Sequence, residues 1–277
     1  MLPNLIKRAV TGLFFVLVMV GGIFFSSYSF LALFSLIVLL SLREFYSLIN
    51  QHMNTGINVW LNSIVGVCFF GVITGTQLLF IPSSLLYFSP FLLYFLFLFI
   101  RELYNTKSAP FTNLAFTVLG HFYITLPFSL LTLLACYPIE GDSSYKWFMV
   151  LAIFIFIWVN DSGAYLVGSQ IGKRRLFERI SPKKSWEGFW GGVICATLSA
   201  AAFGYFVTIL PIYIWMGLAF TVSIAGVFGD LTESMMKRII GVKDSGNILP
   251  GHGGMLDRFD AILFAIPAAL LYMLLFV

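Results

Sequence analysis

The stretch FMVLAIFIFIWVNDSGAYLVG, residues 148–168, decides the fold. Residues 148–159 are all apolar, and the whole stretch is long enough, as a helix, to cross the roughly 30 Å hydrocarbon core of a bilayer. One carboxylate, Asp161, interrupts it. The stretch therefore predicts a transmembrane helix that carries an acidic side chain.

The rest of the chain has the same character. Of its 277 residues 60% are hydrophobic and only 10% are charged, and the mean hydropathy is +0.95. Soluble domains contain roughly 25% charged residues, so the composition indicates an all-α polytopic integral membrane protein. The apolar run after Lys7 and Arg8 is expected to be a retained first helix rather than a cleaved signal peptide. Nine spans are predicted, at about 8–25, 29–48, 59–80, 84–104, 111–136, 147–169, 188–209, 212–238 and 259–277.

The basic residues predict the orientation of the chain. With nine spans and a cytoplasmic amino terminus, all of the 16 Lys and Arg residues except Lys146 fall on the cytoplasmic side. This bias follows the positive-inside rule. It places the two most polar loops, 170–187 and 239–258, at the same cytoplasmic face. Basic side chains there either bind anionic lipid head groups or only set the topology.

Two acidic side chains lie inside predicted spans. A carboxylate at the centre of a membrane helix costs about 2.5–3.5 kcal/mol on insertion scales, so Asp161 and Asp230 are candidates for function. Helical spacing puts Trp158, Asp161 and Tyr165 on one face, and Asp161 lies about 12 Å from the cytoplasmic end of its helix. Asp161 either lines a cavity open to the cytoplasm or forms an ion pair with an inward Lys or Arg.

The stretch SPKKSWEG, residues 181–188, follows that helix. Ser181 and Pro182 predict the start of a helix, with Lys183 and Lys184 in its first turn. The free N–H groups and the positive dipole end of such a helix attract anions. The spacing matches neither a P-loop nor a dinucleotide-binding glycine pattern. We therefore expect a phosphate-binding site here, and a lysine pair that only sets topology is the alternative.

A polar stripe is predicted at the inner end of the span 212–238. Asp230, Glu233, Ser234 and Lys237 recur at i, i+3, i+4 and i+7, so they share one helix face. Carboxylates at one end of the stripe, with Lys237 and Arg238 at the other, suit a metal ion together with phosphate. A ladder of ion pairs within the helix would use the same residues.

The glycine-rich loop 246–254 leads into the last predicted helix. Its glycines permit positive φ and close approach of the backbone to a ligand. Asp257 and Asp260 follow in the first turn of that helix, where negative charge is favoured. If the loop brings Asp230 and Asp257 together, a cation between them relieves the repulsion. Mg²⁺ is commonly held by one or two carboxylates plus substrate phosphates.

The stretch SMMKRIIGVKDSGNILPGHGGMLDRFD, residues 234–260, resembles the signature of phosphatidate cytidylyltransferases, also called CDP-diacylglycerol synthases. That signature reads S-x-x-K-R-x4-K-D-x-G/S/A-x2-L/I/F-P/G-x-H-G-G-x-x-D-R-x-D, and every fixed position is matched. NDSGAY, residues 160–165, and SPKKSWEG are also similar to that family. The resemblance divides the single transmembrane domain, 1–277, into amino-terminal helices without a diagnostic motif, 1–145, and a catalytic part, 146–277.

The resemblance implies that CTP and phosphatidic acid react to give CDP-diacylglycerol and pyrophosphate with Mg²⁺, at the cytoplasmic face of a bacterial inner membrane. Asp230 and Asp257 would hold the metal, and Asp161 would hold a second cation or a phosphate-bound water. The expected catalytic residues are Asp230, Asp257, Lys237 and Arg238. The expected substrate-binding residues are Lys183, Lys184, Ser185, Ser234, Lys243, His252, Gly253, Gly254 and Arg258. His252 either donates to a phosphate oxygen or orders the loop. Three further acidic residues are expected to orient these side chains without touching substrate: Glu233, Asp244 and Asp260.

Other functions would use the same residues. A cytidylyltransferase for another lipid phosphate and a CTP-dependent lipid kinase both remain open. A transporter is the alternative from a different class, but it would place charge near the midplane, whereas here charge gathers at the cytoplasmic rim and no inverted repeat is seen. The expected partners are CTP, phosphatidic acid and membrane lipids, with no nucleic acid. A homodimer is a further assembly that the sequence leaves open.

Overall fold

The structure is a computed structural model that describes residues 2–78, 85–106, 109–246, 248 and 253–277, with the backbone alone for residues 2–9. Within these residues, eight helices are long and apolar enough to cross a membrane. They coincide with eight of the nine predicted spans. The first predicted span lies on α1, Leu2–Phe24, in which the apolar stretch with described side chains, Val10–Phe24, is shorter. The chain is an all-α integral membrane protein, with eight candidate spans and one shorter apolar stretch among the residues that the structure describes.

The chain divides into two compact units, each of which is continuous in space but not in sequence. One unit is Met1–Thr132 with Asp244–Arg258, and the other is Leu133–Lys243 with Phe259–Val277. Segment Asp244–Arg258, which carries most of the glycine-rich signature, therefore belongs with the amino-terminal helices.

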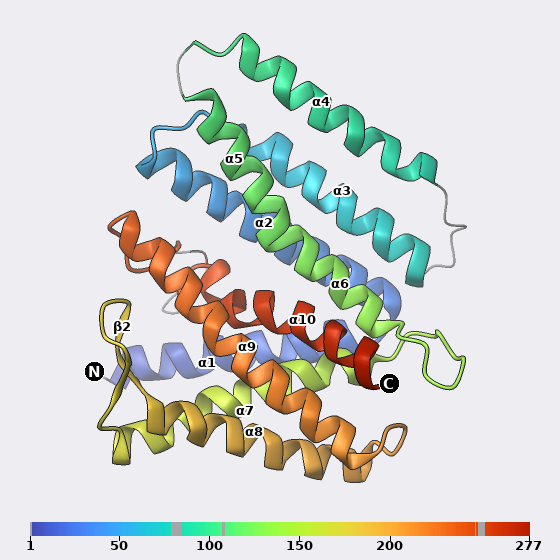
Figure 1. The fold of residues 1–277 in the computed structure, drawn as a ribbon, viewed down its shortest axis with the longest axis vertical. Helices are drawn as coiled ribbons and strands as arrows, with labels where there is room; N and C mark the ends of the chain where they lie inside the picture. The colour runs from blue at the N-terminus through green and yellow to red at the C-terminus, as the bar shows by residue number, and fades with distance from the viewer. Residues whose placement is uncertain (1, 79–84, 107–108, 247, 249–252) are drawn as a thin grey trace. The chain divides into compact units, whose positions relative to one another are not determined.

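The first unit is a group of helices, most of which pack against α2 (Ser27–His52). The helices are α1, α2, α3 (Val59–Leu78), the short η1 (Leu85–Phe88), α4 (Ser89–Leu103), α5 (Pro110–Gly120), η2 (His121–Thr125) and α6 (Leu126–Ala135), the last of these up to Thr132. Figure 1 shows α3 and α5 running beside α2. Aromatic rings fill the core: the centroid of Phe34 lies 4.6 Å from that of Phe30 and 5.8 Å from that of Phe128. These buried rings anchor α2 in the unit.

The second unit is a group of long helices joined at one end by a hairpin. It contains α7 (Trp147–Ile171), β1 (Arg175–Phe177), β2 (Ser181–Ser185), α8 (Trp186–Phe206), α9 (Ile212–Ile239) and most of α10 (Leu256–Phe276). Helix α8 packs against both α7 and α9 (Figure 1). Glycine permits the contact of α7 with α8, because a Cβ on Gly192 would lie 2.6 Å from the carbonyl oxygen of Asn160.

The hairpin corrects one prediction. Ser181 and Pro182 do not start a helix: residues 181–185 form β2, which pairs antiparallel with β1. A residue before proline favours extended backbone, and here the extended state continues to Ser185. Helix α8 starts only at Trp186, where the Ser185 hydroxyl caps it by accepting the N–H of Gly188 at 3.1 Å. Lys183 and Lys184 therefore lie on a strand and not in a helical first turn.

Candidate active site

The structure brings together one predicted phosphate ligand and one predicted metal ligand. Lys184 on β2 forms an ion pair with Asp230 on α9, with 2.5 Å between Nζ and Oδ2. The two side chains are 29% and 34% exposed, so the pair lies at an accessible position. The hydroxyl of Ser234 donates to the other carboxylate oxygen of Asp230 at 3.2 Å. A lysine and a carboxylate that lie far apart in sequence thus share one site.

An apolar cluster holds the hairpin near α9. Ile180, just before β2, is buried with Phe189 of α8 and with Val227 and Leu231 of α9. Leu231 follows Asp230 directly, so the same packing that fixes the hairpin also fixes the backbone on which Asp230 stands. The position of Lys184 therefore depends on burial of apolar side chains, which the polar motif itself does not reveal.

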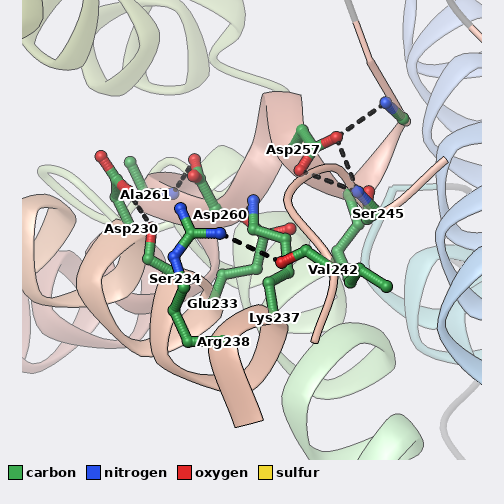
Figure 2. Close-up of polar contacts among 12 residues, drawn as sticks. Asp230, Glu233, Ser234, Lys237, Arg238, Val242, Ser245, Asp257, Asp260 and Ala261 are labelled. Atoms are coloured by element: carbon green, nitrogen blue, oxygen red, sulfur yellow. Dashed lines mark hydrogen bonds and ion pairs between the residues drawn. The ribbon is translucent and has the colours of Figure 1, made fainter. Parts of the chain in front are cut away.

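The polar stripe on α9 is confirmed, and so is part of the ion-pair alternative (Figure 2). Lys237 pairs with Glu233 at 3.1 Å, and both side chains are buried, with 11% and 1% exposure. Arg238 is exposed and donates to the carbonyl oxygen of Val242 at 3.1 Å. The stripe therefore contains two ion pairs. Glu233 and Lys237 neutralise each other's charge within α9, whereas Asp230 pairs with Lys184 on β2.

Asp260 approaches this stripe from α10. A Cβ on Gly229 would lie 2.5 Å from the carbonyl oxygen of Asp260, so the two backbones meet closely beside Asp230. The Asp260 carboxylate accepts the N–H of Ala261 at 2.6 Å, forms a side-chain hydrogen bond with Glu233, and interacts electrostatically with Asp230 and Lys237. Asp260 thus lies beside Lys237, and its role in orienting Lys237 and Arg258 stays a prediction.

Asp257 orders the loop that precedes α10. Its Oδ2 accepts the backbone N–H groups of Ser245 at 3.0 Å and of Gly254 at 2.8 Å (Figure 2). Between these groups Gly253 has φ +80°, a conformation that favours glycine. The carboxylate thus acts as a backbone acceptor. Its role as a metal ligand with Asp230 stays a prediction, since the two residues belong to different units.

The other predicted site residues are placed as follows. Asp161 is exposed on α7 and accepts a long hydrogen bond, 3.4 Å, from the side chain of Asn160. Ser185 is buried and engaged in capping α8. His252 lies outside the described residues. Four more are exposed: Lys183, Lys243, Asp244 and Arg258.

The acidic side chains of the site bear on metal binding. Within the described part of the chain, no group of three or more His, Cys, Asp and Glu side chains is arranged to enclose a metal ion. A complete protein cage is not what Mg²⁺ requires, because it usually keeps waters and binds substrate phosphates beside one or two carboxylates. The partly exposed carboxylate of Asp230 fits a Mg²⁺ ion of that kind.

One residue near the signature was missed by the sequence interpretation. Glu44 on α2 is only 7% exposed, and its Oε2 accepts the N–H of Leu256 at 2.8 Å. The signal that selected Asp161 and Asp230, a carboxylate within an apolar span, also applies to Glu44 at the inner end of the span 29–48.

Comparison with known proteins shows which family the chain belongs to. A model of the cytidylyltransferase family matches residues 6–276. A protein of Staphylococcus aureus (strain COL), named phosphatidate cytidylyltransferase, is 48% identical over 119 residues, which are 43% of this chain and 46% of the relative. A protein of Bacillus subtilis (strain 168) with the same name is 54% identical over 123 residues, 44% of this chain and 45% of the relative. The match thus spans a little under half the length of these curated relatives. Because the family model covers almost all of the sequence, the chain belongs to the cytidylyltransferase family.

Proposed function

We propose that the protein transfers the cytidylyl group of CTP to phosphatidic acid, giving CDP-diacylglycerol and pyrophosphate. The observation that carries this proposal is the pair of Lys184 and Asp230 at an accessible position at the inner end of α9. The names of the relatives from S. aureus and B. subtilis support the choice of substrates. Eight of the described helices are long and apolar enough to cross a membrane, so a lipid substrate could reach the site from the bilayer.

The reaction joins two anions. An oxygen of the phosphatidic acid phosphate attacks the α-phosphorus of CTP, and the bond from that phosphorus to the bridging oxygen breaks. Pyrophosphate leaves with the electron pair. Since the nucleophile is already anionic, no strong general base is needed, and catalysis consists mainly of positioning and charge neutralisation.

The basic residues of the chain would provide that neutralisation. Lys184 is paired with Asp230 and can turn to bind a phosphate oxygen when substrate enters. Further donors would come from four exposed basic residues: Lys183, Arg238, Lys243 and Arg258. Lys237 is buried and paired with Glu233, so it would supply a fixed positive charge rather than a mobile phosphate clamp.

Mg²⁺ is part of the proposal. Asp230 would hold it, with Asp257 as a second ligand and Asp161 at a second cation or a phosphate-bound water. When bound, the ion would neutralise charge on the phosphate oxygens. The site would face the cytoplasm of a bacterial inner membrane, because the basic hairpin and the loop 239–258 fall on the predicted inner side.

A labelling experiment tests the reaction class. Purified protein is incubated with phosphatidic acid, Mg²⁺ and CTP labelled with ³²P at either the α- or the γ-phosphate, and the lipid is extracted into chloroform. Label in the lipid is expected from the α-position only. Label from the γ-position would show a kinase instead. No label from either, under conditions that activate the B. subtilis relative, would overturn the proposal and leave an enzyme for another lipid or a transporter.

A further inference from the structure

Glu44 is a buried carboxylate in a helix that the signature motif does not include. It lies on α2, 212 residues before Leu256 of segment Asp244–Arg258, yet both belong to the same compact unit. Its neighbour Phe45 and the following Tyr46 are buried as well, so this turn of α2 is fixed in the core. Burying a carboxylate is costly unless hydrogen bonds compensate for the lost water, so a specific partner is expected.

That partner is the backbone of the segment. Glu44 Oε2 accepts the N–H of Leu256, the first residue of α10, at 2.8 Å. The first N–H groups of a helix have no acceptor within the helix, and a negative charge is favourable beside them. Glu44 therefore caps α10 from a different helix.

The glycines of the segment fit around the same carboxylate. A Cβ on Gly246 or on Gly254 would collide with Glu44 Oε1. At Gly254 it would also collide with the hydroxyl of Ser245. Gly254 lacks the positive φ seen at Gly253, so its requirement for glycine is one of space rather than of backbone conformation.

A second carboxylate closes the segment on itself. Asp257 accepts the N–H of Gly254, and Glu44 accepts that of Leu256, so two carboxylates hold backbone amides only two residues apart. Asp257 belongs to the segment itself, whereas Glu44 stands on α2. Of these two carboxylates, Glu44 is therefore the one that ties the segment to α2.

We propose that Glu44 is a positioning residue for the proposed cytidylyl transfer: it holds Gly254, Leu256 and hence Asp257 at a fixed place against α2. The inference rests on the proposed function, since the position of Asp257 matters only if the segment serves the reaction. A misplacement of about 1 Å can cost roughly a hundredfold in rate, so the tie has kinetic consequences.

The test compares Glu44→Ala with Glu102→Ala. Glu102 is the matched control: it is a buried glutamate, 6% exposed, in the same unit, and it accepts hydrogen bonds from Asn105 at 2.6 Å and Asn113 at 2.8 Å without contacting the segment in these bonds. For Glu44→Ala we expect kcat to fall by about tenfold to a hundredfold, with a smaller change in KM for CTP. Glu102→Ala should keep a kcat near that of the unchanged protein.

Hydrogen exchange followed by mass spectrometry provides a readout that is independent of activity. In Glu44→Ala the peptides covering Gly253–Arg258 should exchange faster, while those of α7 and α8 stay unchanged. Glu44→Gln keeps one oxygen acceptor for Leu256 and should restore part of the protection. If Glu44→Ala leaves both exchange and kcat unchanged, or if Glu102→Ala reduces kcat equally, the proposal is wrong.

A double variant keeps the proposal testable if Glu44→Ala folds poorly. Gly254→Ala should speed exchange of the same peptides because its Cβ collides with the Glu44 carboxylate. In the Glu44→Ala background that collision is gone, so Gly254→Ala should have a smaller effect than in the unchanged protein. Equal effects in both backgrounds would show that Glu44 and Gly254 are not coupled. Should the chain lack cytidylyl transfer altogether, the exchange results still decide whether Glu44 holds the segment.

Discussion

Asp257 combines two roles that substitution by alanine cannot separate. Its carboxylate accepts the N–H groups of Ser245 and Gly254, and it is also a proposed metal ligand. Asp257→Ala should remove more than nine-tenths of the activity, a loss above about 1.4 kcal/mol. Asp257→Asn keeps an oxygen acceptor for the backbone but removes the charge. If the charge is needed for Mg²⁺, the asparagine variant should lose as much kcat/KM as the alanine variant.

The measurement is kcat/KM in detergent over a range of Mg²⁺ concentrations, with circular dichroism to confirm that both variants are folded. An asparagine variant that keeps more than about a tenth of the rate would exclude Asp257 as a metal ligand. It would then be a residue that orders the loop, as its hydrogen bonds already indicate.

Lys184 offers a second test at the level of one side chain. Lys184→Gln removes the partner of Asp230 and a proposed phosphate donor, so kcat/KM for CTP should fall by at least about tenfold. Lys173→Gln is the control, because Lys173 is an exposed lysine just before the same hairpin. If both variants lose activity equally, the lysines act only through their contribution to topology.

At the scale of elements, the junction of β2 and α8 depends on Ser185. Its hydroxyl accepts the N–H of Gly188, and replacing such a cap by alanine costs about 1 kcal/mol. Ser185→Ala should therefore lower the midpoint of thermal unfolding. Ser199→Ala is the control within α8, since the Ser199 hydroxyl only bonds to the carbonyl of Ala196 in the helix interior. Equal shifts for the two variants would contradict a capping role.

The hairpin also shows where prediction from sequence reaches its limit. Long apolar runs predict helices reliably because each run alone meets the length that a bilayer requires. The pair Ser181 and Pro182 is compatible with a helix start and with extended backbone. In the extended form Ile180 is buried with Phe189 and Leu231. Leu231 lies far away in the sequence, so the residues around Ser181 and Pro182 do not reveal this contact. The ion pair between Lys184 and Asp230 could therefore not be predicted from the sequence, although both residues could be selected as candidate site residues.

For the whole molecule, the division into units differs from the order of the sequence. The signature is one continuous stretch in the sequence, yet Ser234–Lys243 folds with α7 and α8, and Asp244–Arg258 folds with α2. The amino-terminal half has no motif of its own, and Glu44 gives it a role by contact with the backbone of Leu256. Because Glu44 accepts a backbone N–H from Leu256, the identity of Leu256 carries no sign of the contact, and the traces left in the sequence are the glycines Gly246 and Gly254, whose lack of a side chain leaves room for the carboxylate.

The topology of the whole chain can be tested across a single helix. Ser143 and Arg179 are both exposed, and only α7, which carries Asp161, separates them as a candidate span. In a variant without Cys68, Cys136 and Cys195, a cysteine at Arg179 should react with a membrane-impermeant maleimide in inverted vesicles and not in spheroplasts. A cysteine at Ser143 should do the reverse, because the positive-inside rule places the basic hairpin in the cytoplasm. Labelling of both cysteines from one side would mean that α7 does not cross, and Asp161 and Lys184 would lose their predicted cytoplasmic location together.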